Sequence, residues 1–473
     1  MNEIKEVICN EKDFPKLTES ILKHKELVFI PKGFEADEFK KLKEETRNYL
    51  SEKFQIDFGK KPIIANGHQP EFQHPGILFK DLLIHKIAEL TKGLPLHIVV
   101  DTDQFEMSYA YPERLETGFA HLKTLHLKDK DNRVYSQTTL SEEDRKELTS
   151  IIQSQIEEAK YFISPTIQKE FVHILNRKLE LLKTHQYLFE VNEIIREEFY
   201  QSRKIHIYRI NVSELVKLHS FKVLIEKIRK HLDEFMQVYN QSLIDYRKEH
   251  KIKNHAQPIP NLVSGEMPFW ILDPITKKRN VMRVEDSVDN ACILPKAVTL
   301  TMFMRLFMTD FFIHGKGGGR YEEVSEHIIK EFFKIEAAPY EVASATMHLN
   351  KTEWFPVPDI DEKELELKLR DTVYSPEKFL DHTNPLAIQK KELQNKFKNP
   401  DSDKKELHKE ISFLNEQMAK LILPEKEKLE QTKSQLPIIQ HTNMIFQSRT
   451  LPFYYYNMDE LIEYVEKYCN YSA

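Results

Sequence analysis

The chain has 473 residues, of which 40% are hydrophobic and 30% are charged. This is enough to form one large hydrophobic core or several domains, and the composition is not that of a disordered protein. Its net charge of −6 provides no general attraction to nucleic acid or to anionic membranes. The three cysteines, Cys9, Cys292 and Cys469, lack CxxC spacing, so neither a disulfide framework nor a thiolate zinc site is expected.

The first 140 residues predict one part of a parallel sheet. Residues 62–65 indicate a short strand, 66–76 a turn-rich loop, 77–90 a helix with apolar residues at helical spacing, and 96–100 a second strand. A strand–loop–helix–strand unit of this length crosses over and builds a parallel sheet. We therefore expect the N-terminal part of an α/β core at 1–140.

The middle of the chain predicts a helical insertion followed by the rest of the core. Residues 141–260 are rich in Lys and Glu, and the part up to residue 255 contains no glycine. The α/β pattern then returns over 261–380, where a strand at 311–314 is followed by a glycine loop at 315–319 and a helix at 320–333. The apolar helix before this strand carries Arg305, for which we expect a carboxylate partner such as Asp310.

The C-terminal quarter predicts a helical arm and a final core segment. Residues 381–437 contain a heptad seam and a shorter seam, separated by a break at 399–401, which predicts an antiparallel coiled-coil hairpin. The seams consist of Leu407, Ile411, Leu414, Met418 and Leu421, and of Leu393 and Phe397. The arm is either a solvated helix pair or the contact of a homodimer. Residues 438–473, with the aromatic run 453–456, are expected to pack on the core.

Two further features bear on location and metal content. The N-terminal segment lacks the apolar region of a secretory signal, and the most apolar window, 297–313, is interrupted by charges and is shorter than a membrane span. The sequence also contains no HExxH motif and no His-x-His pair, so a zinc enzyme is not expected. We expect a cytoplasmic protein that contacts neither membrane nor nucleic acid.

The first candidate site lies where the first strand passes into its helix. The unpaired N–H groups and the dipole of a helix N-terminus bind anions, and histidines there can donate hydrogen bonds to phosphate oxygens. We therefore predict catalytic roles for His68 and His74. The ligand-binding candidates of this segment are Gly67, Gln69, Gly76 and Lys80. The alternative is a turn whose histidines only cap the helix.

The second candidate site is the acidic end of the next strand. Asp101 and Asp103 follow the strand at 96–100, and ligands of open α/β sheets bind outside the carboxyl ends of strands. These carboxylates could hold ribose hydroxyls, an amine or Mg²⁺. The alternative is an aspartate that caps the following segment. We predict catalytic roles for both residues.

The third candidate site is a glycine-rich segment between a strand and a helix. Glycine allows a close backbone approach to a ligand and positive φ, and Lys316 and Arg320 add positive charge. The segment is not a Walker A loop, because no Lys-Ser/Thr pair follows its last glycine. Its candidate ligand-binding residues are His314, Gly315, Lys316, Gly317, Gly318, Gly319, Arg320 and Tyr321.

The order of these motifs resembles that of the bacillithiol biosynthesis cysteine-adding enzyme family, whose members are thought to be cysteine ligases. The early Gly-Gln-Gln loop of that family, with its Gly-Pro and a helix lysine, is similar to Gly67-His68-Gln69, Pro75-Gly76 and Lys80. Its acidic strand end is similar to Asp101–Phe105. Its later glycine loop is similar to Gly315–Arg320, and a heptad segment follows in both. The resemblance extends over most of residues 60–435.

The resemblance implies a Rossmann-like core related to nucleotidyltransferases, helical insertions and a coiled-coil arm for dimerisation. It also implies an ATP-dependent ligase that joins an amine, cysteine or similar, to a small sugar-linked substrate, with ATP or another nucleotide and with or without Mg²⁺. His68 stands where the family has Gln, and Arg320 replaces a glutamate. An acid-to-base change reverses the charge that a ligand loop prefers, so we expect a divergent relative.

Two classes of function remain open from the sequence. The first is the ligase, in which catalysis comes mainly from positioning and electrostatic stabilisation of phosphate. The second is a nucleotide- or phosphosugar-binding protein that has lost catalysis and acts through its arm. Release of pyrophosphate or ADP from ATP in the presence of candidate amines distinguishes them.

Overall fold

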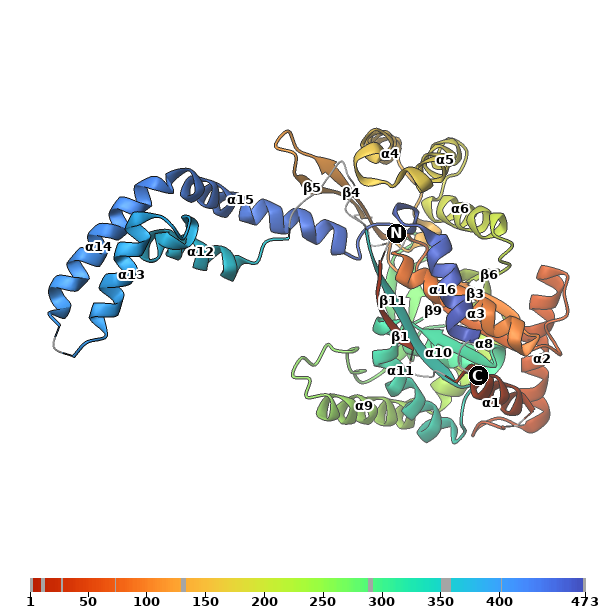
Figure 1. Ribbon diagram of the computed structural model, residues 1–473. Helices are drawn as coiled ribbons and strands as arrows, with labels where there is room; N and C mark the ends of the chain where they lie inside the picture. The colour runs from red at the N-terminus through yellow and green to blue at the C-terminus, as the bar shows by residue number, and fades with distance from the viewer. Residues whose placement is uncertain are drawn as a thin grey trace. The chain divides into compact units, whose positions relative to one another are not determined.

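The computed structural model describes residues 3–9, 13–26, 29–72, 74–128, 133–287, 292–349, 359–400 and 402–470 (Figure 1). The chain divides into two compact units. Unit 1 comprises Met1–Tyr111, Lys123–Asn350 and Ser448–Ala473, and unit 2 comprises Pro112–Leu122 and Lys351–Gln447. The two units are described separately.

Unit 1 is built on a six-stranded sheet with the order β1-β11-β10-β2-β3-β6. The five strands from β11 to β6 are parallel, and β1 pairs antiparallel with β11. The bounds are β1 Glu3–Cys9, β2 Ile63–His68, β3 Leu94–Val99, β6 Tyr208–Asn211, β10 Phe311–His314 and β11 Tyr340–His348. The predicted mixed α/β fold with a mainly parallel sheet is confirmed.

The parallel strands are added in two directions from the middle of the sheet. The chain begins the parallel part at β2, continues outward through β3 and β6, and then returns to β10 on the other side of β2. β10 and β2 are in register, with Ile313 opposite Asn66. Their carboxyl ends therefore lie next to each other at the point where strand addition reverses, which is the usual ligand position in open α/β sheets.

Helices cover both faces of this sheet. On one face α3 contacts α1 and α16, and on the other α2, α8, α9, α10 and α11 share the main hydrophobic core with alternate residues of β2 and β3 (Figure 1). Alternate strand residues point to opposite faces of the sheet, so one set of side chains from β2 and β3 packs in this core and the other set faces α3. The bounds are α1 Phe14–Glu26, α2 Ala36–Phe54, α3 Pro75–Thr91, α7 Val212–Leu215, α8 His219–Lys230, α9 Leu232–Glu249, α10 Ala297–Phe303, α11 Lys316–Ile328 and α16 Met458–Asn470.

The predicted insertion at 141–260 is largely helical but also supplies a strand of the main sheet. Its first helices are α4 Glu142–Phe162, α5 Pro165–Leu181 and α6 Leu188–Ser202. Expecting only helices here was wrong, because Tyr208–Asn211 forms β6 beside β3. This four-residue edge strand buries one aliphatic side chain, Ile210, and so has no hydrophobic pattern of its own.

Two smaller sheets and several short helical segments complete unit 1. The hairpin strands are β4 Glu106–Arg114 and β5 Ala120–Lys128, part of which belongs to unit 2, and the antiparallel sheet β8-β7-β9 contains β7 Glu266–Leu272, β8 Arg279–Arg283 and β9 Cys292–Pro295. Short turns of helix are η1 Tyr135–Gln137, η2 Met304–Met308, η3 Ile329–Phe333 and η5 Phe453–Tyr455. The aromatic residues 453–456 are at most 4% exposed, so their predicted packing on the core is confirmed.

Unit 2 contains a helical hairpin within a longer arm. Its helical segments are α12 Glu362–Tyr374, η4 Pro376–Phe379, α13 Pro385–Phe397, α14 Lys404–Leu421 and α15 Leu423–Gln447. Leu393 of α13 shares a small core with Leu414 and Met418 of α14. Leu421 of the predicted seam is instead 55% exposed. Unit 2 contains more of the chain than the predicted hairpin at 381–437, since it also includes Pro112–Leu122. Within the unit, Thr442 Oγ1 of α15 accepts a hydrogen bond from Ala120 N and donates one to Ala120 O.

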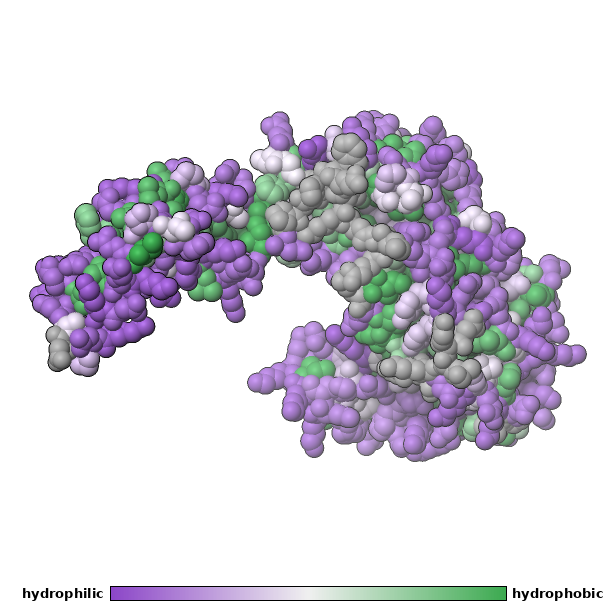
Figure 2. Space-filling view, in the orientation of Figure 1, coloured by the Kyte–Doolittle hydropathy of each residue, from purple (hydrophilic) through white to green (hydrophobic). Residues whose placement is uncertain are grey.

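The visible surfaces of both units are mainly hydrophilic, with hydrophobic residues in separate small groups (Figure 2). Within the described ranges, no helix combines the length and the apolar character needed to cross a membrane.

Candidate functional site

A cavity of about 1390 Å³ in unit 1 opens at the carboxyl ends of β2 and β10. Both predicted ligand segments line it, as expected from their positions after these strands. The predicted residues on its wall are Gly67, His68, Gln69, Gly76, Lys80, Asp103, His314, Gly315, Lys316, Gly317, Gly318, Arg320 and Tyr321. His74, Asp101 and Gly319 do not belong to this lining. The structure thus brings the two loops together.

The cavity wall carries an excess of positive charge in a protein with a net negative charge. Among the described residues, six cationic side chains line it, namely Lys80, Arg279, Lys296, Lys316, Arg320 and Arg449. The carboxylates of this described lining are Asp103 and Glu266, and both are already paired, with Arg279 at 2.8 Å and with Lys296 at 2.5 Å. The cavity therefore favours an anionic ligand.

Lys80 lies at the point where strand addition reverses. Its side chain is 3% exposed and donates a hydrogen bond of 2.9 Å from Nζ to the carbonyl oxygen of Gly67. A Cβ added at Gly315 would lie 4.0 Å from the same Nζ, so the ammonium, carried by α3, lies between the end of β2 and the start of α11. Burial lowers the pKa of Lys80 to about 8, Asp81 raises it in part and Arg196 lowers it further. Gly67 is the single hydrogen-bond acceptor that the described residues offer this ammonium.

The N-terminus of α11 is open. Its N-cap residue, Gly315, makes no side-chain cap, and the first helical bond runs from Gly319 N to Gly315 O at 2.9 Å. The amide groups of Lys316, Gly317 and Gly318 therefore have no intrahelical acceptor. A Cβ at Gly317 would meet no atom within 4 Å, which leaves open space beside these amides.

The glycine segment differs from its predicted form. Residues 316–319 are the first turn of α11 rather than a loop, and no glycine of this segment has positive φ. Two of the glycines allow close packing, since a Cβ at Gly319 would lie 2.6 Å from Val342 Cγ2 and one at Gly318 would lie 2.9 Å from His314 Nδ1. The expected loop with positive φ was therefore wrong.

His314 and Arg305 belong to a buried ionic cluster beside the cavity. His314 Nε2 lies 3.1 Å from Glu322 Oε2, and Arg305 Nη1 lies 2.5 Å from Glu322 Oε1. Burial raises the pKa of Glu322, but His314 and Arg305 outweigh it and the pKa is lowered. The expected carboxylate partner of Arg305 is therefore confirmed, but it is Glu322 and not the suggested Asp310, which pairs with Arg47 at 2.7 Å.

His74 closes the N-terminus of α3. Its Nδ1 accepts a 3.1 Å hydrogen bond from Gly76 N, and its Nε2 lies 2.9 Å from the carbonyl oxygen of Met347 in β11. The residue is 3% exposed, and burial lowers its pKa to about 4, so it is neutral. With both ring nitrogens bound to backbone, His74 occupies the capping position that was the alternative to a catalytic role.

The two aspartates after β3 have different environments. Asp101 is 0% exposed, and its Oδ1 accepts a 2.9 Å hydrogen bond from Ser213 N, which joins the end of β3 to α7, directly after β6. Burial raises the pKa of Asp101 to about 6. Asp103 lines the cavity instead, where its carboxylate accepts from Gln69 Nε2 at 3.0 Å and from Arg279 Nη1 at 2.8 Å. Asp103 is thus placed to meet a ligand, whereas Asp101 is not.

Two of the predicted residues of the wall, His68 and Tyr321, have pKa values shifted toward their neutral forms. Burial, assisted by the nearby charge of Lys80, lowers the pKa of His68 well below its usual value. Burial raises the pKa of Tyr321 to about 12. Both are therefore neutral at pH 7 and act as hydrogen-bonding groups rather than as charges.

Several residues of the wall had no signal in the sequence. Trp270 of β7 lies between two basic residues, with Arg279 and Lys296 each 4.7 Å from its ring. Arg449, far along the chain, donates hydrogen bonds of 2.9 Å to Thr346 and to Ser344 of β11. These residues occur in ordinary strands and connections, so only the fold shows that they share a cavity with Lys80.

The sequence matches no protein-family model, and it has no match among curated proteins. What can be said about the ligand therefore comes from the cavity itself.

Proposed function

We propose that this chain is a nucleotide-dependent enzyme that binds the phosphates of ATP or another nucleotide between β2 and β10. One observation carries the proposal: the buried ammonium of Lys80 lies beside the uncapped first turn of α11, at the reversal of the sheet. A helix N-terminus with free amides and a lysine with spare donors form the kind of site that binds phosphate.

The strand order supports a Rossmann-like, nucleotidyltransferase-like core as part of the proposal. Numbered along the chain, the parallel strands β6-β3-β2-β10-β11 have the order 3-2-1-4-5, which is that of the first five strands of dinucleotide-binding sheets. In open α/β sheets of this kind, ligands bind outside the carboxyl ends of the strands where strand addition reverses, which here lies between β2 and β10. Lys80 and the start of α11 occupy this position.

The reaction that we propose is that of a ligase, in which the nucleotide activates an acceptor for attack by an amine. Lys80, Arg320 and the α11 amides would stabilise the phosphates, and neutral His68 would donate a hydrogen bond to them. Asp103 would hold the ammonium or a ribose hydroxyl beside Gln69. Catalysis of this kind depends on positioning and on fixed charges. The proposed acceptor is a small sugar-linked molecule, which the size of the cavity allows beside a nucleotide.

A protein-borne Mg²⁺ site does not fit the residues of the cavity. Among the residues that the structure describes, no group of three or more His, Cys, Asp or Glu could hold a metal. Asp103 is already bound to Arg279. Any Mg²⁺ would arrive with the nucleotide phosphates, and no step is assigned to it here.

A second candidate function is nucleotide or phosphosugar binding without catalysis. It is favoured by the positions of His74 and Asp101, which were predicted to be catalytic but are held in backbone contacts away from the cavity. Pyrophosphate or ADP release from ATP with a panel of amines and sugar-linked acceptors separates the two functions. Release above background supports the ligase, and tight ATP binding without release supports the binding protein.

The binding part of the proposal is tested by Lys80→Met, which keeps the length of the side chain and removes its charge. We expect the affinity for ATP, measured by calorimetry, to fall about 10- to 100-fold, since a hydrogen bond to a charged group contributes roughly 1.5–3 kcal/mol. The matched control is Lys86→Met on the same helix, because Lys86 lies outside the cavity lining and is paired with Glu89 at 3.2 Å. Equal affinities of the Lys80→Met variant and the wild type would refute phosphate binding at this position.

We also propose that the arm of unit 2 mediates a homodimer as a coiled coil. Phe413 and Leu421 of α14 support this, since they are 59% and 55% exposed although the hairpin already has its own small core. Light scattering of the full chain decides between a dimer and a monomer.

A further inference from the structure

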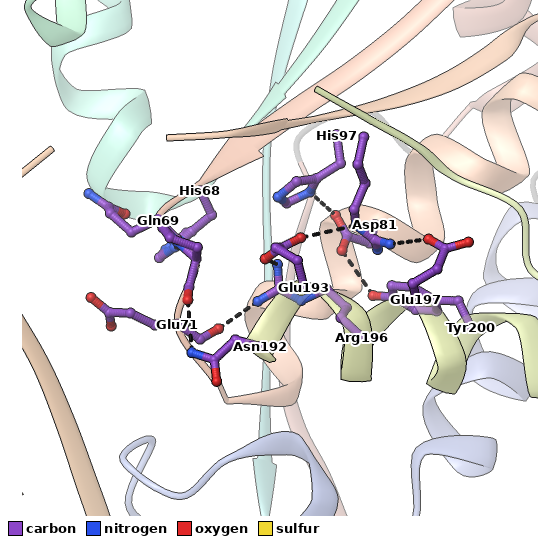
Figure 3. A network of polar contacts seen from close by, with 12 residues as sticks. His68, Gln69, Glu71, Asp81, His97, Asn192, Glu193, Arg196, Glu197 and Tyr200 are labelled. Atoms are coloured by element: carbon purple, nitrogen blue, oxygen red, sulfur yellow. Dashed lines mark hydrogen bonds and ion pairs between the residues drawn. The ribbon is translucent and has the colours of Figure 1, made fainter. Parts of the chain in front are cut away.

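The loop after β2, which begins with the predicted ligand residue Gln69, is held by side chains of α6. Asn192 donates from Nδ2 to the carbonyl oxygen of Pro70 at 2.9 Å, and Arg196 donates from Nη2 to that of Glu71 at 2.5 Å (Figure 3). Asn192 is 0% exposed and Arg196 is 1% exposed. Two consecutive peptide groups of the loop are therefore fixed from one helix.

Helix α6 is itself fixed against the sheet and α3. Tyr200 donates to Asp81 Oδ2 of α3 at 2.9 Å, and Asp81 Oδ1 accepts 2.7 Å hydrogen bonds from Asn66 Nδ2 of β2 and from His97 Nδ1 of β3 (Figure 3). Asp81 is next to Lys80 in the sequence. The same buried layer thus fixes the helix that holds the loop and the helix that carries the phosphate-binding lysine.

The outer side of the loop is held by different contacts. Tyr135 donates to Glu71 Oε1 at 2.6 Å, and the Phe72 ring lies 4.1 Å from Lys178 Nζ of α5. These contacts act on side chains. The peptide group between Pro70 and Glu71 also donates within the loop, from Glu71 N to Gln69 O at 2.9 Å. Among the contacts described, the side chains that bind the carbonyl groups of Pro70 and Glu71 are those of Asn192 and Arg196.

The use of polar side chains for this contact points to a need for precise geometry. Burying an arginine and an amide is costly unless they are well paired, and apolar packing between a helix and a loop is often equally stable. Here Arg196 Nε and Asn192 Oδ1 remain without a hydrogen-bond partner among the described residues. The helix therefore retains two imperfectly satisfied polar side chains that direct two carbonyl groups.

We propose that Asn192 and Arg196 are positioning residues of the nucleotide site. They fix the backbone from which His68 and Gln69 enter the cavity, although neither lies on the cavity wall. Gln69 then holds Asp103, which in turn holds Arg279 on the opposite sheet. Helix α6 thereby orients a chain of side chains across the cavity. The inference rests on the proposed function, because the nucleotide is the ligand to be positioned.

The test replaces the donor of Asn192 by an acceptor of the same size in Asn192→Asp. A carboxylate oxygen would then face the carbonyl of Pro70 and repel it. The control is Gln201→Ala on the same helix, where the side chain is exposed and bonds to Glu197 one turn earlier. A second variant, Arg196→Lys, keeps the charge but loses one of the two paired nitrogens. It remains informative if Asn192→Asp does not fold.

Two measurements are made on each variant. Hydrogen exchange of the free protein, followed by mass spectrometry, is expected to become at least about fivefold faster in peptides that cover residues 66–76, with β3 and β10 unchanged. Calorimetry with ATP is expected to show about tenfold weaker binding for Asn192→Asp and a smaller loss for Arg196→Lys. Gln201→Ala should match the wild type in both.

A structural role alone would change stability without changing affinity in the folded state. Faster loop exchange with ATP affinity within twofold of the wild type would therefore overturn the positioning role, and so would unchanged loop exchange. Absence of ATP binding to the wild type would instead refute the proposed function. The exchange measurement needs no ligand and still decides whether α6 holds the loop.

Discussion

Two helices, α3 and α11, begin at the same edge of the same sheet, after the neighbouring strands β2 and β10. At α3 the N-terminus is closed, because His74 accepts from Gly76 N and also binds β11. At α11 the N-terminus is open, because Gly315 supplies no side-chain cap. The sequence predicts an anion site at both, and the structure leaves free amides at one.

The glycines at the two ends differ in the same way. A Cβ at Gly76 would lie 1.6 Å from the carbonyl oxygen of Ala345, so this glycine is required for helix–strand packing. A Cβ at Gly317 would meet nothing within 4 Å. A glycine at a helix N-terminus therefore indicates a ligand only when the space in front of it is open, which a motif cannot show.

The largest effect that we expect concerns the closed end. His74→Ala removes the cap of α3 and leaves the buried Met347 carbonyl without this partner, which should lower the free energy of unfolding by about 2–4 kcal/mol. Denaturant unfolding measures this loss. The catalytic role that the sequence predicts for His74 would instead leave the fold intact and abolish turnover.

His68→Ala is the comparison for that variant, since His68 lines the cavity. It should weaken ATP binding with little change in stability. If His74→Ala unfolds at the wild-type denaturant concentration but no longer binds ATP, the closed end would be part of the site after all.

The next effect concerns the charge at the open end. Because the pKa of Lys80 is about 8, the ammonium loses its proton as the pH rises through this value, and ATP affinity should fall about fivefold between pH 8 and pH 9. Calorimetry at several pH values measures the slope, which should be absent in Lys80→Met. A wild type with no slope would show that this ammonium does not meet the phosphates.

Unfolding cannot produce that loss. Folded Lys80 releases its proton near pH 8, whereas an unfolded lysine holds it until about pH 10.5. The unfolded state therefore binds more protons in this interval, so the contribution of Lys80 to the free energy of unfolding rises with pH. As the pH rises to 9, the burial of Lys80 therefore destabilises the folded protein less, while ATP binding becomes weaker.

The sequence predicted the parts of the fold that repeat a strong local pattern. The strand at 311–314 has the predicted bounds, because it is a short continuous run of buried residues, most of them apolar. The sequence did not predict the strands β6 and β11. β6 is too short for a pattern, and the sheet places it only through its pairing with β3.

The candidate site was predictable up to the edge of the sheet on which it lies. Two loops after parallel strands share one edge by topology, and both line the cavity. The roles of single residues were not predictable, since His74 and His68 differ only in what lies opposite them. Arg279 and Arg449 reach the cavity through tertiary structure from distant segments.

The smallest effect is expected at Gly317, which is compared with Gly319 in the same first turn of α11. Gly317→Ala places a methyl group in empty space, so stability should be unchanged or rise by up to about 1 kcal/mol through helix propensity. Gly319→Ala in the same turn should lose about 1–3 kcal/mol, because its Cβ would lie 2.6 Å from Val342 Cγ2.

ATP affinity should differ between these two variants in the opposite direction from stability. The methyl group at position 317 stands beside the free amides, and a phosphate that approaches them would be displaced by part of an ångström. We expect ATP affinity to fall a few-fold in Gly317→Ala, measured by calorimetry, and to stay unchanged in folded Gly319→Ala. If Gly317→Ala binds ATP as the wild type does, the phosphates do not reach this turn, and Lys80 would have to bind them without the helix.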